Sequence, residues 1–263
     1  MKLLLTDSGV SNASILAALV DLLGRPITEA RALCIPTAGY GGLYGDPDGP
    51  WNFISGQADG PMTELGWKSV GVLELTALPS IDKERWVSWV READVLLVNG
   101  GDTLYLCHWM QESGLADVFP SLRDTVYVGL SAGSLVLTPR IGEHFASTNP
   151  RADGDDSTLG LVDFSIFPHI DSPDRTMADA EQWAAGIKGP AYVTDSQTAI
   201  KVTKGSAEVI SEGYWKLFNT AVLRSATFLC RASAAQKNSA ASTGRGRPGA
   251  TTSRKCPRCP RSL

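Results

Sequence analysis

The chain has 263 residues, of which 43% are hydrophobic and 20% are charged. This length is enough for one large domain or two small ones, and it excludes a peptide-sized disulfide scaffold. No apolar run approaches the roughly 18 residues of a membrane span, and the five cysteines are widely spaced. We therefore expect a cytoplasmic protein with reduced thiols and no membrane partner.

The charges are divided unevenly along the chain. Residues 1–212 contain all 28 acidic residues and 14 of the Lys and Arg residues, whereas residues 213–263 contain 10 basic residues and no acidic one. Nucleic-acid binding requires clustered positive charge, so no nucleic-acid partner is expected for the acidic part. We predict a folded domain over 1–218 and a basic, low-complexity, disordered tail over 219–263. A nucleic-acid partner for the tail alone stays open.

Short apolar runs alternate with amphipathic stretches through residues 1–218, which predicts an α/β fold with a mostly parallel central sheet flanked by helices. The Gly-, Pro- and Asp-rich segment 37–60 is expected to be a long loop, either at the substrate site or on the surface. In chain order, strands are expected at Lys2–Thr6, Arg31–Pro36, Val70–Leu75, Asp94–Val98, Thr125–Leu130, Phe164–Phe167, Ala191–Thr194, Ala199–Thr203 and Ala207–Ile210. Helices are expected at Ser11–Leu23, Ile81–Arg91, Thr103–Ser113, Ser134–Leu137 and Pro173–Ile187.

The strongest local signal for chemistry is the sequence Gly-Leu-Ser-Ala-Gly at residues 129–133, which follows a predicted strand and precedes a helix-forming stretch. A serine in such a tight turn projects its hydroxyl from the sheet, and glycines on both sides avoid clashes. The setting predicts a nucleophile elbow with Ser131 as the nucleophile and the backbone N–H of Ala132 as an oxyanion donor.

A second oxyanion donor is expected in the sequence Asn-Gly-Gly-Asp at residues 99–102, directly after a predicted strand. Its glycines let the backbone approach a ligand closely, which favours the N–H of Gly101. We take Asn99, Gly100 and Asp102 as candidate substrate-binding residues, while Asp102 also fits as a helix cap.

A serine hydroxyl needs a base, and the chain has three histidines: His108, His144 and His169. We favour His169, because it follows an apolar run and so lies at the carboxyl end of a strand, where active sites of α/β sheets assemble. The imidazole in turn needs an acidic partner. Asp195 follows another predicted strand and is the candidate, with Asp171 as the alternative.

Two short motifs bear on cofactors. The glycines of segment 39–45 miss the G-x-G-x-x-G spacing of a dinucleotide site by one position. Cys256 and Cys259 have the spacing of a zinc knuckle, but a structural site needs four ligands and no second pair lies nearby. We expect no metal and no organic cofactor.

Four segments together resemble one family: Val-Asn-Gly-Gly-Asp-Thr at 98–103, Gly-Leu-Ser-Ala-Gly-Ser at 129–134, Phe-Pro-His at 167–169 and Thr-Asp-Ser-Gln-Thr-Ala-Ile at 194–200. In this order they look like the serine peptidases of family S51, which include aspartyl dipeptidase and cyanophycinase. The resemblance covers roughly residues 1–218. It implies a fold similar to class I glutamine amidotransferases, with Ser131 as nucleophile, His169 as base, and the amides of Gly101 and Ala132 as oxyanion donors.

The resemblance also implies hydrolysis of an amide bond in short peptides, including aspartyl dipeptides, through an acyl-enzyme. An aspartyl side chain would need a cation. Arg175 is the best-placed candidate, and Arg140 and Arg151 are the next candidates. Cyanophycinase-like members often carry a glutamate where this chain has Ser196, so the acidic partner must be Asp195 or another residue.

Two other classes stay open, a serine esterase of the α/β-hydrolase fold and a non-catalytic or regulatory protein on an amidotransferase-like scaffold. The expected partners are a short peptide substrate and, as an open alternative, a second copy of the chain in a homodimer.

Overall fold

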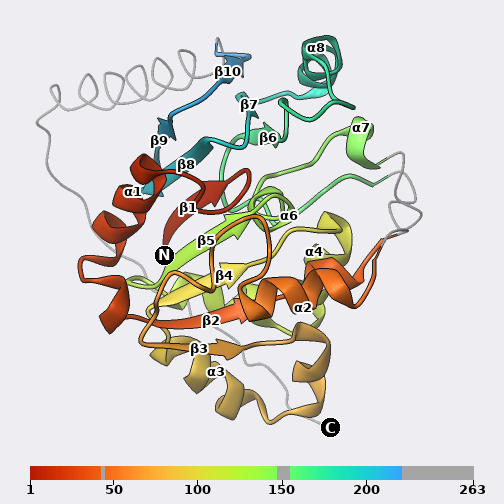
Figure 1. Ribbon diagram of the computed structural model, residues 1–263. Helices are drawn as coiled ribbons and strands as arrows, with labels where there is room; N and C mark the ends of the chain where they lie inside the picture. Colours follow the sequence, from red (N-terminus) through yellow and green to blue (C-terminus); the bar gives the residue numbers. More distant parts are fainter. Residues whose placement is uncertain (43–44, 147–154, 221–263) are drawn as a thin grey trace, which may run out of the picture. The chain divides into compact units, whose positions relative to one another are not determined.

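The computed structural model describes residues 1–42, 45–146 and 155–220, all of them within one unit of the chain, Met1–Val222 (Figure 1). From residue 221 on, the predicted tail with Cys256 and Cys259 lies outside the described residues, and so does Arg151. Within the described ranges, no helix is both long and apolar enough to cross a membrane.

The main sheet has the strand order β3-β2-β4-β5-β1-β8-β9. The five strands from β3 to β1 are parallel, whereas β8 and β9 continue the sheet in antiparallel fashion. Each parallel strand is four or five residues long. Strands β1, β4 and β5 are largely apolar and buried, as expected for strands covered on both faces, whereas the edge strand β3 is mostly exposed. The strands are β1 Lys2–Thr6, β2 Arg31–Ile35, β3 Ser69–Val72, β4 Val95–Val98, β5 Val126–Leu130, β8 Thr198–Thr203 and β9 Ser206–Ser211.

Helices cover both faces of this sheet. Successive residues of a strand point to opposite faces, so they belong to two different cores. Leu4 packs with α1 and α2, whereas Leu5 packs with α3, α4 and α6. The helices are α1 Ala13–Leu23, α2 Asp48–Ser55, α3 Lys83–Glu92, α4 Thr103–Glu112, α5 Leu115–Val118, α6 Ala132–Leu135, α7 Glu143–Ala146 and α8 Met177–Gly186. Four short 3-10 turns join them: η1 Ile27–Glu29, η2 Thr37–Tyr40, η3 Leu75–Ser80 and η4 Phe119–Ser121.

A second, three-stranded sheet is formed by β6 Ser165–Phe167, β7 Ala191–Thr194 and β10 Trp215–Phe218, in the order β10-β7-β6. Strands β6 and β7 are parallel, and β10 pairs with β7 in antiparallel fashion. Helix α8 packs on this sheet through Trp183, which lies in one core with Phe167 and Val193. The residues that follow β6 in the small sheet thus lie beside the carboxyl edge of the main sheet.

Every strand expected from the sequence is present, with ends shifted by three residues at most. Several features were not predicted, among them the short helices α5 and α7. Segment 37–60 was expected to be a loop but contains η2 and α2, where Phe53 is buried against the main sheet. Strand β10 and the division into two sheets were also missed, because strand order is not encoded in local periodicity.

Candidate active site

Ser131 stands at a sharp turn between β5 and α6, with φ 48° and ψ −110°. Close packing requires the glycines on either side. A Cβ on Gly129 would lie 2.4 Å from the carbonyl oxygen of Gly133, and a Cβ on Gly133 would lie 2.3 Å from the carbonyl oxygen of Val98. No side chain fits at either position, which is the local reason why the sequence folds into a nucleophile elbow here.

Strand β1 brings Asp7 beside this turn. Because β1 and β5 are parallel with Thr6 opposite Leu130, the residues that follow them, Asp7 and Ser131, are neighbours at the carboxyl edge. The N–H of Ser131 lies 3.1 Å from the carbonyl oxygens of both Thr6 and Asp7. The backbone of the elbow is therefore fixed to the end of β1.

His169 contacts both residues. Its Nε2 lies 2.8 Å from Ser131 Oγ, and its Nδ1 lies 2.5 Å from Asp7 Oδ1. The side chain of Asp7 is fully buried, whereas that of His169 is 28% exposed. The imidazole can therefore meet a substrate while its acidic partner is shielded from water.

Further hydrogen bonds hold the Asp7 carboxylate in place. Oδ2 accepts from the N–H of His169 at 2.7 Å and from Thr194 Oγ1 at 2.8 Å, and Oδ1 accepts from Ser8 Oγ at 3.0 Å. A buried carboxylate with this many donors has one preferred orientation. Asp7 thus fixes both the ring and the backbone of His169.

The backbone is strained at two of these positions. Both Ser131 and His169 have positive φ, 48° and 59°, which residues other than glycine adopt uncommonly, although His does so more often than Ser. Such a conformation costs on the order of 1–3 kcal/mol and persists only where surrounding contacts impose it. Here the contacts are the hydrogen bonds to Asp7 and to the end of β1.

Asp195, which the sequence suggested as the acidic partner, does not contact the imidazole. Its Oδ1 accepts from Gln197 N and Thr198 Oγ1, and its Oδ2 accepts from Tyr214 N. Asp195 thereby ties the turn between β7 and β8 to the segment before β10. The acidic residue in contact with His169 is instead Asp7, which sequence reasoning missed.

Asp171, the alternative, is also engaged elsewhere. Its Oδ2 accepts from the N–H and the hydroxyl of Ser196, at 3.1 and 2.5 Å. Burial acts to raise the pKa of Asp171, but hydrogen bonds from Ser196 and from the backbone, together with the nearby charge of His169, outweigh burial, and the pKa is lowered. Asp171 therefore stays ionised near His169 without bonding to its ring.

The expected oxyanion donors lie close to the elbow. A Cβ on Gly100 would lie 3.4 Å from Ser131 Cβ, so the loop after β4 passes directly beside the nucleophile. Gly101 has φ 132°, and a Cβ there would lie 2.3 Å from the carbonyl oxygen of Ala38. Within the described residues, the N–H groups of Gly101 and Ala132 form no hydrogen bond, so both are free to donate to a ligand.

The neighbouring polar side chains shape this loop. Asn99 Oδ1 accepts from Gly100 N at 2.9 Å, and Asp102 Oδ1 accepts from Tyr105 N at 2.9 Å as the N-cap of α4. Both side chains are buried, at 9% and 8% exposure. Their hydrogen bonds position the two glycines of the loop.

Arg175 lies beside His169, because its Nη1 donates to the carbonyl of Pro168 at 2.7 Å. Its guanidinium also stacks over Phe145, with 5.2 Å from Cζ to the ring centre. Burial lowers the pKa of Arg175, but an arginine stays charged. No carboxylate of the described chain forms an ion pair with it, whereas Arg140 is bound to Asp156 through two hydrogen bonds of 2.9 Å.

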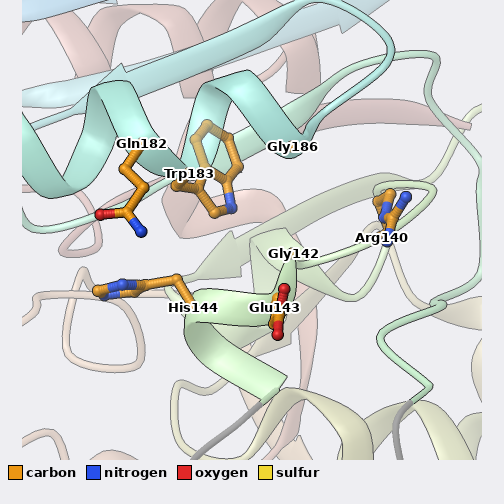
Figure 2. A pocket seen from close by; sticks show the side chains of 7 residues that line it. All are labelled: Arg140, Gly142, Glu143, His144, Gln182, Trp183 and Gly186. Atoms are coloured by element: carbon orange, nitrogen blue, oxygen red, sulfur yellow. The ribbon is translucent and has the colours of Figure 1, made fainter.

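The other two histidines lie among aromatic rings. His108 packs against Trp109 on α4, and His144 packs against Phe145 and Phe167. His144 lines a pocket between α7 and α8 that has a volume of about 420 Å³. Figure 2 shows the lining residues, which are Arg140, Gly142, Glu143, His144, Gln182, Trp183 and Gly186. Among the described residues, no group of three or more His, Cys, Asp and Glu side chains is arranged to hold a metal ion.

A mostly parallel sheet with a strained serine, a histidine and a buried aspartate in contact at its carboxyl edge is the arrangement of an α/β hydrolytic enzyme. The chain belongs to peptidase family S51, whose model matches residues 3–210. It is accordingly a peptidase.

Two solved structures have a similar fold. A protein described as a candidate peptidase E from Listeria monocytogenes EGD-e superposes with a TM-score of 0.59 at 18% identity, covering 81% of this chain and 98% of its own. A peptidase from an acI-B1 Actinobacterium also gives 0.59 at 18% identity, covering 83% of this chain and 93% of its own. The expected fold, of the class I glutamine amidotransferase type, is confirmed. No curated protein sequence matches the chain significantly.

Proposed function

We propose that the protein is a serine peptidase that hydrolyses an amide bond in short peptides through an acyl-enzyme, with Ser131 as nucleophile, His169 as base and Asp7 as the residue that orients the imidazole. The observation that carries this proposal is the pair of contacts made by one ring, 2.8 Å to Ser131 Oγ and 2.5 Å to Asp7 Oδ1. The two ring nitrogens are thus assigned different roles, as acid–base chemistry at a serine requires.

In the first half-reaction, Ser131 Oγ attacks the peptide carbonyl carbon while its proton passes to His169 Nε2. The carbonyl oxygen gains negative charge, which the N–H groups of Gly101 and Ala132 stabilise. The C–N bond then breaks, and His169 returns the proton to the leaving amine. Water repeats the sequence on the ester, with His169 again taking and returning the proton, and releases the acid.

Asp7 supports both steps by keeping Nδ1 protonated and the ring aimed at Ser131. Its burial matters, because the attraction between a carboxylate and an imidazolium is stronger where water is excluded. The carboxylate therefore stabilises the charged ring that forms during attack.

Arg175 supports a preference for an aspartyl side chain. Its guanidinium lies next to Pro168, which precedes the catalytic His169, and it has no carboxylate partner within the described chain. A half-buried, unpaired guanidinium in a chain of net charge −4 favours an anionic group on the substrate.

An esterase of the α/β-hydrolase fold is less well supported. In that fold the triad runs in the order Ser, acid, His along the chain. Here the order of the contacting residues is Asp7, Ser131, His169.

The test is labelling with a fluorophosphonate probe together with digestion of a dipeptide library. Wild type should be labelled at Ser131 and should cleave part of the library, and Ser131→Ala should do neither. Ser134→Ala is the matched control, because that hydroxyl is committed to the carbonyl oxygens of Thr6 and Gly129. A wild-type protein that resists the probe and cleaves nothing would indicate a non-catalytic member of the family.

A further inference from the structure

A second pocket is lined by residues that neighbour the proposed catalytic residues Asp7 and Ser131 in the chain. It has a volume of about 530 Å³ and is lined by Ser8, Ser11, Asp59, Gly60, Pro61, Leu130, Ser196 and Gln197. Leu130 directly precedes Ser131, and Ser8 directly follows Asp7. A group held in this pocket is therefore close to the reacting carbonyl, and the volume is within the range of small-molecule sites.

The pocket wall is fixed by packing of segment 59–61 against the residues after β1. The carbonyl oxygen of Pro61 accepts from Val10 N at 2.9 Å. A Cβ on Gly60 would lie 2.6 Å from Leu130 Cδ1 and 3.0 Å from the carbonyl oxygen of Ser8. Asp59 is consequently carried on a segment that is held against the elbow.

The hydroxyl groups at the pocket are acceptors. Ser8 Oγ donates to Asp7 Oδ1, Ser11 Oγ donates to the carbonyl oxygen of Ser196, and Ser196 Oγ donates to Asp171 Oδ2. A hydroxyl has a single hydrogen, so each of these oxygens has only lone pairs left for a ligand.

Among the lining residues within the described part of the chain, Asp59 alone carries a formal charge. Its carboxylate is exposed and forms no hydrogen bond or ion pair with the part of the chain that is described. A carboxylate together with acceptor hydroxyls suits a cationic donor group, which is the chemistry of an ammonium. Gln197 also lines the pocket, and because its Oε1 accepts from Asn12 Nδ2 at 3.3 Å, its amide adds N–H donors beside these acceptors.

We propose that this pocket binds an ammonium group of the peptide substrate and that Asp59 is the residue that selects for it. This inference rests on the proposed peptidase function and names a substrate feature of the same site. The ammonium can come from a free N-terminus or from a lysine side chain, and the experiment separates the two sources.

Binding is measured on the Ser131→Ala protein, which holds peptides without turnover, by calorimetry with Asp-Leu and Ala-Leu and with their N-acetylated forms. Acetylation should weaken binding about tenfold, equivalent to about 1.4 kcal/mol. Adding Asp59→Asn should weaken the free peptides by a similar factor and leave the acetylated ones unchanged, so that the effect of acetylation disappears. If Asp59→Asn also weakens the binding of N-acetyl-Lys-Leu, the lysine side chain is a source of the bound ammonium.

Asp124→Asn is the matched control. It removes the same charge from an exposed aspartate that precedes β5, at the opposite end of that strand from Ser131. It should leave every affinity unchanged.

An acetylation effect of equal size before and after the Asp59→Asn substitution overturns the inference, and so does an absence of binding by every peptide. Fluorophosphonate labelling of the wild type is read separately. If Ser131 is labelled but Asp59→Asn does not change the effect of acetylation, the peptidase proposal is supported and only the proposal of an ammonium pocket is rejected.

Discussion

Asp7 Oδ1 lies 2.5 Å from His169 Nδ1, although 162 positions separate the two residues in the chain. The same carboxylate accepts the backbone N–H of His169, so one side chain fixes both the direction of the ring and the strained backbone that carries it. Asp195, the acidic residue at the end of β7, makes neither contact and instead joins Gln197, Thr198 and Tyr214.

Asp7→Asn is expected to lower kcat by roughly 10³-fold or more while the protein stays folded, because the amide cannot stabilise the imidazolium and favours the wrong tautomer. Steady-state kinetics over a pH series would measure this, together with the rate of fluorophosphonate labelling. Asp195→Asn is the control and should reduce the unfolding free energy with little change in kcat. The reverse outcome would assign the acidic role to Asp195.

Arg175→Ala should lower kcat/KM for peptides with an N-terminal aspartate by about 100-fold, as expected for loss of a charge-assisted pair. Peptides with an N-terminal alanine should change little. Because the ring of Phe145 lies under the guanidinium, Arg175→Met keeps part of this packing and should give the same selectivity loss. An equal loss on both peptide series would show that Arg175 supports the structure and does not select substrate.

Gly101→Ala should destabilise the protein and reduce kcat, since its Cβ would lie 2.3 Å from the carbonyl oxygen of Ala38 at a φ of 132°. We expect a loss of about 3 kcal/mol in urea unfolding, from overpacking added to the backbone strain. Gly205 also has positive φ, 77°, but has open space around it, so Gly205→Ala should cost only about 1 kcal/mol and leave kcat unchanged. Equal losses would mean that space at Gly101 is not limiting.

Burial raises the pKa of the Cys34 and Cys107 thiols to about 11, against an ordinary value of 9.0. Above pH 9.0 the unfolded chain releases thiol protons that the folded chain keeps. The stability contributed by the buried thiols is thus complete below that pH and is lost as the pH rises towards 11.

Alkylation offers the simplest measurement of these two thiols. At pH 8.5, iodoacetamide should leave both cysteines unmodified in the native protein and should modify both in urea, as mass spectrometry of peptides would reveal. In urea titrations the double variant Cys34→Ala, Cys107→Ala should lose less stability between pH 9 and 11 than the wild type. Rapid alkylation in the native state would contradict the burial of these thiols.

The sequence by itself predicted every strand except β10, together with the elbow and the candidate base, because each of these depends on neighbours in the chain. The apolar run before Ser131, its two flanking glycines, and the position of His169 after β6 are all local patterns. The composition of segment 37–60 led to one wrong prediction, because its many Gly and Pro residues indicated a loop where the structure contains α2.

The acidic partner was decided only by the tertiary structure. Several aspartates follow apolar strands, and local sequence does not distinguish them; Asp7 follows β1 as Asp195 follows β7. What distinguishes them is the pairing of β1 with β5, which places Thr6 opposite Leu130, and the separate sheet that carries His169 over this edge. Strand order arises from long-range packing of the two sheet faces, so the choice of carboxylate becomes visible only once the chain is folded.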